Sequence, residues 1–471
     1  ISALLNYDRR NETEIIKNDK SRRKIFALSL VCGVAGTALL ITGNLPTGTL
    51  GSVLIVMFLY GFFISFSSGV PAFFDKRPRI KYAKTHLLVY RSLASKLNTT
   101  GVTMATISLL ITATLLCEGA GFIFNTIFER RDARATNHDL YIYSEETETG
   151  FEAYKEYISA HIPVRESREY TLYNGETGAI SKWLEETVPN YLSDNDRDLL
   201  LKMSDYAALR KMLGFPEARL EPGAYIIHCM DYLKNKMENY HAPLTLGGQT
   251  LAKGAVYTEE FSQWDGNGEN FILAVPDEMA ENLTPAAKIY ALMTVEPVRG
   301  EKFTALRAIQ DAQYEARLSE TPAPPYYSVQ SKAAIRENTA FMNAVFVFPL
   351  FYLSIVLTMT AATILTIQLL SEAGRYRKQY ALLRSQGMDA RDMNRSLRRQ
   401  FALFYAMPAL PPVLICLTFM LAQIGTLDAG VILNRAHAWG IIGLTLAVFF
   451  VIYLIYIAAS YISFKRSVLP E

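Results

Sequence analysis

Long apolar runs separated by polar stretches dominate the pattern of this 471-residue chain. A helix that crosses a bilayer needs about 20 mostly apolar residues, and six stretches meet that requirement. They are Ile25–Gly43, Thr49–Val70, Val102–Phe124, Ala340–Leu370, Phe401–Ile424 and Trp439–Ser463. Charged residues are almost absent from their interiors, and Glu118 is the exception. The pattern therefore predicts an α-helical polytopic membrane protein with six transmembrane helices.

A polar region of about 210 residues follows the third apolar run and mixes two periodicities. The stretches "FEAYKEYISAH", "SDYAALRKMLGF" and "TALRAIQDAQYEARL" have helical spacing, whereas "AYIIHCM", "NFILAVP" and "IYALMTV" are typical of short strands. We therefore expect one large α/β domain, inserted between helices three and four.

Charge is divided unevenly between the polar parts of the chain. The formal net charge is +2, but residues 129–337 hold 34 acidic and 22 basic residues, a balance of −12. The remaining +14 lies mostly beside the apolar runs, in residues 17–24, 75–96, 375–400 and 464–466. Basic loops stay on the cytoplasmic side, and six alternating spans place all four segments there. The acidic domain and the loops Asn44–Gly48 and Gly425–Ala438 are then expected on the extracytoplasmic side.

These patterns together predict how the chain is divided. We expect a cytoplasmic segment (1–24), two membrane helices (25–70), a basic cytoplasmic loop (71–100), a third membrane helix (101–127), the extracytoplasmic α/β domain (128–338), a fourth membrane helix (339–374), a cytoplasmic segment (375–400), two more membrane helices (401–463) and a cytoplasmic tail (464–471). The chain begins at Ile1 without a cleavable signal pattern. We therefore expect it to be part of a longer protein.

The segment "RYRKQYALLRSQGMDARDMNRSLRRQ", residues 375–400, holds eight basic residues between two apolar runs. We expect the fourth membrane helix to continue from Ala340 to about Ser385. Within it Tyr376, Tyr380 and Leu383 recur at i, i+4 and i+7 and form one apolar face.

Gly387 is then expected to end that helix. Asp389 is well placed to cap a second, short helix, with Asp392 in its first turn. Met393 and Leu397 recur at i and i+4 in this second helix, while the arginines occupy other positions. These arginines are Arg391, Arg395, Arg398 and Arg399. A basic helix that lies on lipid and a helix on which a cytoplasmic partner docks fit this pattern equally, whereas nothing else in the chain supports nucleic-acid binding.

The stretch "YALLRSQGMDARDMNRSLRRQ" resembles the segment of FtsX-like ABC transporter permeases that couples the membrane helices to the ATPase. The matching positions are Leu383, Arg384, Gly387, Met388, Arg391 and Asp392, and Asp389 lies between them in the same segment. The layout is similar too, with one helix, a large outer domain, a long helix, the coupling segment and two more helices. By this resemblance, the seven residues form the contact with the ATPase.

The whole chain is similar to the BceB-type branch of that family, which takes part in resistance to antimicrobial peptides such as bacitracin. The phrases "LLLKMSDYAALRKMLGF" and "NFILAVPDEMAENL" also resemble that branch. Residues 25–70 correspond to its extra helix pair, and Val102 onward to its second four-helix module. The first four-helix module is missing here, so "ISALLNYDRRNE" corresponds to its trailing end.

This resemblance implies a permease of the bacterial cytoplasmic membrane that removes or exports antimicrobial peptides. The implied partners are a cytoplasmic ABC ATPase, as a dimer, which holds ATP and magnesium, a membrane histidine kinase, membrane lipids and a cationic peptide or lipid-linked substrate. The ATPase would dock on residues 375–400 and also on 76–96. Two alternatives are a non-transporting regulator of cell-wall hydrolases, like the division FtsX proteins, and a lipoprotein-release permease. The extra helix pair argues against both.

We do not expect this chain to bind a nucleotide or a cofactor, or to catalyse a reaction itself. No phosphate-binding G-x-x-x-x-G-K-[ST] loop occurs, so no cofactor, no nucleotide and no enzymatic activity is expected in this chain. The four cysteines have no metal-binding spacing, and the six histidines are scattered. "DGNGEN" at 265–270 lacks the remaining ligands of a calcium loop and is better interpreted as a turn. The acidic balance of the outer domain would attract cationic peptides, or serve solubility alone.

Glu118 is the remaining candidate residue. An acid within a membrane span is costly and usually faces protein or water, so Glu118 is a possible intramembrane functional acid. It also lies near the outer end of its helix, beside Gly119 and Gly121. An interfacial acid at a tight helix contact is an equal alternative.

Overall fold

The computed structural model describes residues 20–42, 45–75, 86–135, 137–145, 147–148, 150–188, 191, 197–262, 266–268, 270–319, 326–427 and 435–468. The chain divides into two compact units. The helical unit comprises the residues up to Ile123, Val347–Thr426 and those from Arg435 onward. The sheet unit comprises Phe124–Phe346 together with residues 427–434.

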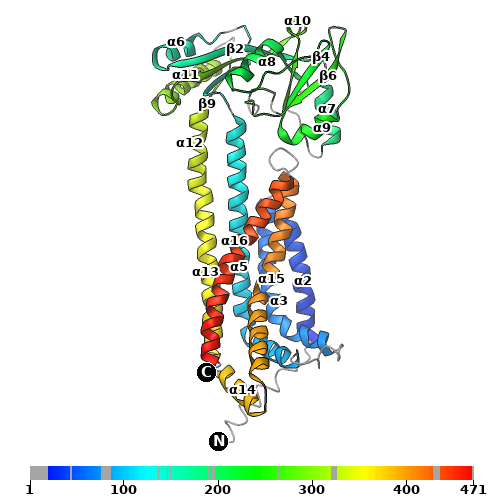
Figure 1. Cartoon of the computed structure of the whole chain (residues 1–471), viewed down its shortest axis with the longest axis vertical. Helices are drawn as coiled ribbons and strands as arrows, with labels where there is room; N and C mark the ends of the chain where they lie inside the picture. The colour runs from blue at the N-terminus through cyan, green and yellow to red at the C-terminus, as the bar shows by residue number, and fades with distance from the viewer. Residues whose placement is uncertain are drawn as a thin grey trace. The chain divides into compact units, whose positions relative to one another are not determined.

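Six helical stretches carry the apolar runs, and each is long and apolar enough to cross a membrane (Figure 1). They are α2 (Lys20–Ile41), α3 (Leu45–Asp75), α5 (His86–Ala135), α12 (Lys332–Met342) with the π turn η3 (Asn343–Val347) and α13 (Phe348–Ser371), α15 (Ala390–Leu427) and α16 (Arg435–Val468). The six predicted apolar segments are thus confirmed as helices. Their insertion in a membrane stays a prediction.

The helices extend past the apolar runs, and three predicted loops are shorter than expected. In the predicted loop Gly425–Ala438, α15 continues to Leu427 and α16 begins at Arg435. In the predicted loop 71–100, α3 continues to Asp75 and α5 begins at His86. The predicted loop Asn44–Gly48 is wrong in the same way, because α3 already begins at Leu45. Once a helix is formed, each further residue adds a hydrogen bond, so polar flanks continue a helix that apolar residues begin.

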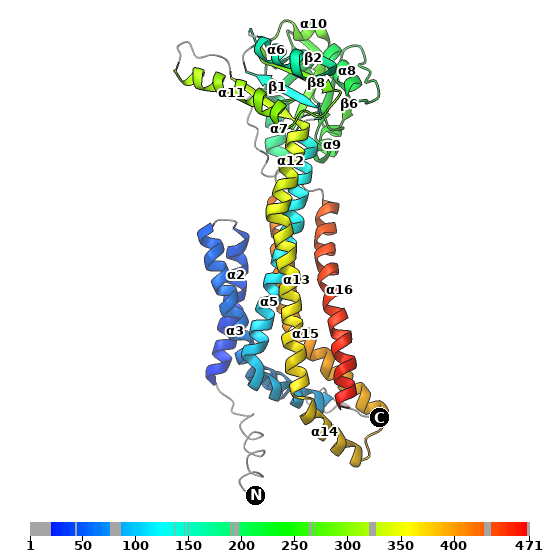
Figure 2. The same ribbon diagram turned by 90° about the vertical axis from the view of Figure 1, so that its left-hand side faces the viewer.

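The prediction of one continuous helix from Ala340 to Ser385 is also wrong. Helix α13 ends at Ser371, and α14 (Ala373–Ser385) begins beyond Glu372 and leaves the line of α13 (Figure 2). The Glu372 amide bonds to the Leu369 carbonyl, three residues back, at 3.2 Å. This tightened turn interrupts the α-helical ladder, and Gly374, a poor helix former, follows it.

A second irregularity is the π turn η3, which ends two residues before Pro349. Proline has no amide hydrogen, and its ring crowds the carbonyl four residues before it, here that of Val345. A wider turn moves that carbonyl away from the ring. Pro349, which sits inside an apolar run, therefore accounts for the local change of helix type.

Helices α2 and α3 pack through glycines. A Cβ on Gly36 would lie 2.9 Å from the carbonyl oxygen of Gly51, and a Cβ on Gly51 would lie 2.8 Å from that of Gly36. A Cβ on Gly61 would lie 2.8 Å from the Cβ atom of Ser29. Small residues at these points let the two backbones approach closely, as in membrane helix pairs.

Nine strands of the sheet unit form one mixed sheet in the order β5-β6-β4-β7-β3-β2-β8-β1-β9. They are β1 (Leu140–Ser144), β2 (Val164–Asn174), β3 (Leu199–Lys202), β4 (Ala224–Cys229), β5 (Leu244–Leu246), β6 (Gln249–Tyr257), β7 (Phe271–Val275), β8 (Pro285–Thr294) and β9 (Tyr327–Ser331). β3 pairs with β7 and β4 with β6 in parallel, and the other pairs are antiparallel. The three strands expected from the sequence are confirmed as β4, β7 and β8.

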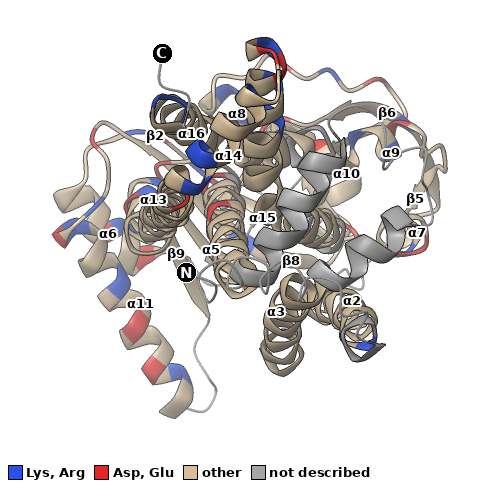
Figure 3. Cartoon of the chain, turned by 90° about the horizontal axis from the view of Figure 1, so that it is seen from below, with Lys and Arg blue, Asp and Glu red and all other residues tan. Residues whose placement is uncertain are grey.

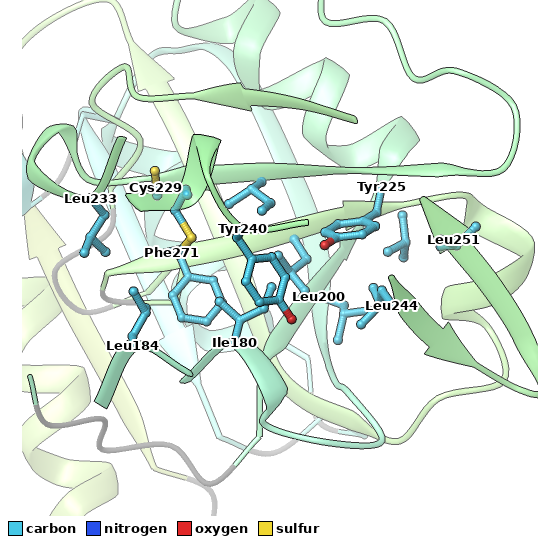
Figure 4. Packing of buried hydrophobic residues seen from close by; sticks show 14 of the residues in the cluster. Ile180, Leu184, Leu200, Tyr225, Cys229, Leu233, Tyr240, Leu244, Leu251 and Phe271 are labelled. Atoms are coloured by element: carbon cyan, nitrogen blue, oxygen red, sulfur yellow. The ribbon is translucent and has the colours of Figure 1, made fainter. Parts of the chain in front are cut away.

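Short helices cover this sheet. They are α6 (Glu152–His161), α7 (Ala179–Thr187), α8 (Met203–Met212), η2 (Asp231–Leu233), α9 (Lys234–Glu238), α10 (Asp277–Ala280) and α11 (Glu301–Ser319). The three expected helices are confirmed as α6, α8 and α11. Every residue of β4 and β7 is buried, as in strands covered on both faces. Figure 4 shows one apolar cluster, in which Tyr225, Tyr240 and Phe271 pack with Leu184 of α7.

Strands β1 and β9 lie next to the two long helices in sequence. β1 begins five residues after α5 ends, and β9 is followed directly by α12. The two strands pair with Leu140 opposite Ser331. Asp132 of α5 and Arg336 of α12 also form an ion pair at 3.8 Å. Within the sheet unit, the ends of these two helices are therefore held together by a strand pair.

Candidate functional site

Helix α14 ends in a glycine turn that sets the direction of the chain. Gly387 has a φ of +89°, a conformation that glycine adopts without a Cβ penalty. The amide of Met388 donates to the Leu383 carbonyl, and that of Gly387 to the Arg384 carbonyl, both at 3.1 Å. These two bonds form a Schellman motif. The prediction that Gly387 ends the first helix is confirmed.

Helix α15 begins directly after this turn. The carbonyl of Asp389 accepts hydrogen bonds from the amides of Asp392 at 3.1 Å and Met393 at 3.0 Å, so Asp389 occupies the expected capping position. Asp392 lies in the first turn, where a negative charge is favourable beside unpaired amides. The turn and the start of the second helix are thus as predicted, but this helix is not the short one expected, because α15 continues without a break through the fifth apolar run to Leu427.

The apolar faces of both helices are used inside the chain. Tyr376 and Tyr380 of α14 are 6% and 2% exposed, and Met393 and Leu397 of α15 are 6% and 0% exposed. The ring of Tyr376 meets that of Phe464 of α16 edge to face, with 5.4 Å between the centroids. The segment is therefore packed within the helical unit through these four residues, whereas Leu383, the third member of the predicted face of α14, is half-buried.

The basic side chains of the segment are on its surface. All eight are exposed, and so are the two basic residues at the end of α16, against which α14 packs. These residues are Arg375, Arg377, Lys378, Arg384, Arg391, Arg395, Arg398, Arg399, Lys465 and Arg466. Figure 3 shows Lys and Arg on α14 in blue. The arrangement is a cationic surface on a packed support, which we call the basic surface.

Hydroxyl groups link the helices that support the basic surface. Thr366 of α13 lies 2.6 Å from the Ser460 hydroxyl of α16 and 3.3 Å from the Tyr405 hydroxyl of α15. The Tyr453 hydroxyl of α16 donates to the Tyr405 carbonyl at 2.9 Å. Three helices are thus joined by specific hydrogen bonds in an apolar environment, where an unpaired hydroxyl would be costly.

Glu118 lies in a tightly packed part of α5. It is 2% exposed, and its Oε1 has no hydrogen-bond partner among the residues that the structure describes. A Cβ on Gly119 would lie 3.1 Å from the sulfur of Met420 in α15, and a Cβ on Gly121 would lie 3.1 Å from the ring of Phe351 in α13. The acid is buried at this helix contact, and its role as an intramembrane functional acid stays a prediction.

The sheet unit contains a buried ionic cluster that the sequence did not reveal. The guanidinium of Arg210, 1% exposed, donates to both carboxylate oxygens of Glu259 at 2.8 and 3.0 Å and lies 4.4 Å from the ring centre of Tyr257. The hydrogen bond from Arg210 lowers the pKa of Glu259 to about 2. Nothing in "SDYAALRKMLGF" signals this burial, because the carboxylate partner is distant in sequence.

His228 completes that cluster. Its Nδ1 lies 2.8 Å from the Tyr206 hydroxyl, and its Nε2 lies 2.8 Å from the Glu259 carbonyl oxygen. Burial lowers the pKa of His228 to about 4, so the ring is neutral near pH 7. The cluster joins α8, β4 and the end of β6, which is a structural role.

Another candidate feature of the sequence is the turn at residues 265–270. No group of three metal-binding side chains occurs within the described ranges. In the stretch 265–270, Asn267 is buried and donates to the Phe261 carbonyl at 2.7 Å, and Gly268 has a φ of +78°, as in a turn. Asp265 and Glu269 lie outside the described residues, as do 76–85 of the second predicted docking region.

Comparison with known proteins gives no family. No protein-family model matches the sequence, and no curated protein matches it. Among the solved structures that match, one from Bacillus anthracis, described as a candidate lipoprotein, shares 10% identity and covers 36% of this chain and 90% of its own. Its TM-score is 0.23, so this similarity carries no argument about fold or function.

Proposed function

We propose that this chain is the permease subunit of an ATP-driven transporter of the FtsX-like, BceB type. It crosses the bacterial cytoplasmic membrane six times, with the sheet unit inserted between helices three and four on the extracytoplasmic side. Its task is to remove or export antimicrobial peptides of the bacitracin kind from the cell envelope, and a membrane histidine kinase senses its activity.

The basic surface carries this proposal. A helix that lies on lipid needs an apolar face free to enter the membrane. Here Tyr376, Tyr380, Met393 and Leu397 are buried within the chain, while the arginines are exposed and Leu382 is a single exposed large apolar residue of α14 rather than an apolar face. This arrangement favours the docking of a soluble, acidic partner surface over the lipid alternative. It supports the expectation, taken from sequence resemblance, that residues 383–392 contact an ATPase.

In this proposal the partner hydrolyses ATP, and this chain binds the partner and responds to it. ATP and magnesium are bound by the partner, which supplies the free energy of hydrolysis. The arginines of the basic surface hold that partner, and the Gly387 turn fixes the angle between α14 and α15. The contact of Tyr376 with Phe464 and the hydrogen bonds of Thr366 connect the segment to α16 and α13. A displacement of α14 would therefore be passed to the membrane helices.

The test is co-purification of the complete protein with the ATPase encoded beside it. Arg384→Glu combined with Arg391→Glu reverses two charges of the basic surface and is expected to abolish co-purification. Arg219→Glu combined with Arg299→Glu makes the same change at two exposed positions of the sheet unit and is the matched control. Retention of the ATPase by the first variant would contradict the proposal.

Peptide susceptibility tests the second half of the proposal. Cells that carry the Arg384 and Arg391 variant are expected to become sensitive to the peptide, while the control variant protects fully. Unchanged sensitivity together with a bound cell-wall hydrolase would instead identify a regulator of the division FtsX kind.

A further inference from the structure

Most of strand β2 has a strand partner on one side only, although β2 lies in the interior of the strand order. On one side β2 pairs with β8 along most of its length, from Val164 opposite Thr294 to Tyr173 opposite Pro285. On its other side β3 pairs only with Leu172–Asn174. Backbone groups of residues 164–171 that point away from β8 therefore have no strand partner among the described residues. Residues 164–167 are all exposed.

The edge of the sheet at β9, in contrast, is covered by a helix. The amide of Val329 in β9 donates to the side-chain oxygen of Gln310 in α11 at 3.0 Å. A helix thus covers that edge and satisfies its backbone, which is one of the usual protections of a strand edge. No described side chain bonds the backbone of residues 164–167 in this way. Among the described residues, the β2 edge therefore remains available for another strand, as does the outer edge of the three-residue strand β5.

The sequence of this edge is complementary to itself in the antiparallel direction. Residues 164–170 read "VRESREY". If two copies pair about a twofold axis at Ser167, Arg165 faces Glu169 of the second copy and Glu166 faces Arg168 of the second copy. The two pairs of Glu166 with Arg168 next to the axis join opposite charges, which stabilise antiparallel strands, whereas Arg165 lies at a bulge and Glu169 already pairs with Lys155 and Lys288. A shift of the axis by half a residue would place Arg165 opposite Arg168.

The charges next to the axis can make such pairs without losing the partners that they have within the chain. Glu166 is exposed, and neither it nor Arg165 has a side-chain partner among the described residues. Arg168 uses its Nε and Nη2 to bond Asp205 Oδ1 at 2.9 and 2.6 Å, and its Nη1 remains unbonded to any described residue. A guanidinium can bind two carboxylates. Arg168 can therefore keep Asp205 and accept Glu166 of a second copy.

We propose that the β2 edge binds a second copy of this chain, so that two sheets join into one across a twofold axis at Ser167. The regular ladder is formed by Glu166–Arg168, because a bulge at Arg165 interrupts the register with β8 and Tyr170 is buried. The apolar side chains of Val164 and Val295, 37% and 67% exposed, flank the contact. This inference is independent of the proposed docking of an ATPase.

The competing explanation is that the charges protect this strand edge from pairing with other strands. Charged residues and bulges are also used to keep strand edges apart, and Arg165, Glu166 and the bulge would serve that purpose if no second copy binds. The two explanations differ in whether the order of the charges matters. Protection requires only charged residues on the edge, in any order, whereas pairing requires an acidic residue at 166 opposite Arg168 of the second copy.

The experiment is thiol cross-linking of the complete chain in detergent micelles with a short bifunctional maleimide. Ser167→Cys places two thiols opposite each other at the axis, where facing Cβ atoms are about 5 Å apart. Ser159→Cys, an exposed serine of α6, is the matched control. The unsubstituted chain, whose cysteines are buried or half-buried, gives the background. We expect cross-linked dimer from Ser167→Cys at about ten times the yield of Ser159→Cys.

The double substitution Arg165→Glu with Glu166→Lys then separates the explanations. It keeps net charge and exposure but sets like charges opposite each other, so the Ser167→Cys yield should fall about tenfold. An unchanged thermal unfolding temperature confirms that the variant is folded. A yield from Ser167→Cys no higher than that of Ser159→Cys, or one unaffected by the exchange, would overturn the proposal.

Discussion

A single residue, Gly387, determines the geometry of the turn between α14 and α15. No atom lies within 4 Å of the position that a Cβ would take there, so its φ of +89° is the sole obstacle to substitution. We predict that Gly387→Ala destabilises the turn by about 1 kcal/mol, and that amides of α14 exchange hydrogen about fivefold faster. Gly374→Ala, in the same helix and also in open space, should slow that exchange. Equal effects of both substitutions would contradict this reasoning.

Glu259 is a single residue on which the stability of the sheet unit depends. Its carboxylate is the ionic partner of the fully buried Arg210, and removing one partner of a buried pair leaves an uncompensated charge. Glu259→Gln should lower the free energy of unfolding by about 3 kcal/mol, measured as faster exchange of amides in α8 and β4. Glu281→Gln, which breaks the more exposed pair with Lys202, should cost less than about 1 kcal/mol.

Acid should destabilise the sheet unit through the same cluster. The pKa of Glu259 is lowered to about 2, so its contribution is complete above pH 4.5 and is lost as the pH falls toward 2. Burial lowers the pKa of His228 to about 4, and burial together with the charge of Lys332 lowers that of His138 to about 3. Both rings are neutral when folded, whereas the unfolded chain takes up protons below pH 6.5.

All three groups therefore act in the same direction. We predict that the unfolding temperature of the sheet unit is constant above about pH 6.5 and falls steadily toward pH 4. Because the unfolded chain of His228→Asn has one proton fewer to gain, this variant should be less stable at pH 7.5 but show a flatter pH dependence. An unfolding temperature that is equal at pH 7.5 and pH 4.5 would contradict the conclusion that these three groups make stability depend on pH.

At the scale of single residues, the sequence predicts a contact only when the two residues that make it are close together in the chain. Tyr376, Tyr380, Met393 and Leu397 are spaced by one helical turn, and their burial followed from that spacing. The end of α14 at Gly387 followed from glycine chemistry. Arg210 was missed because its burial depends on Glu259, which is 49 residues away. No local pattern records such a pairing.

Helices α2 and α3 offer a test at the scale of elements. Because Gly36 and Gly51 leave room only for backbone, Gly51→Leu must separate the two helices. We predict a loss of about 1–3 kcal/mol in the stability of this pair, measured as a lower unfolding temperature of the purified protein. Gly48→Leu, on the same helix with nothing within 4 Å of its Cβ position, is the control and should leave that temperature unchanged.

The elements were easier to predict than their ends and order. Apolar length identified all six long helices, but not the break at Glu372 or the π turn before Pro349, which arise from backbone hydrogen bonding. Three strands of the sheet were recognised because they are continuous apolar runs. Strands β2 and β6 carry mainly partly buried and exposed residues, so their sequences resemble loops. Strand order could not be read from any local pattern.

For the whole molecule, the decisive prediction concerns the two sides of the membrane. The basic segment is expected in the cytoplasm and the acidic sheet unit outside, since basic loops stay inside. Ser167→Cys should react with a membrane-impermeant maleimide on intact cells, whereas Ser385→Cys, equally exposed, should react only after permeabilisation. Labelling of Ser385→Cys on intact cells would reverse the orientation and remove the proposed contact with an ATPase.

The pairing of β1 with β8 and β9 has a consequence for how the protein is made. Leu140 lies between Leu292 and Ser331 in the finished sheet, so both of its neighbours are synthesised long after it. At about 5–20 residues per second, roughly 10–40 s separate the translation of β1 from that of β9. During that interval the sheet lacks its last strand and β1 has open edges. Biosynthesis must therefore hold this region apart from other strands until residue 331 has been added.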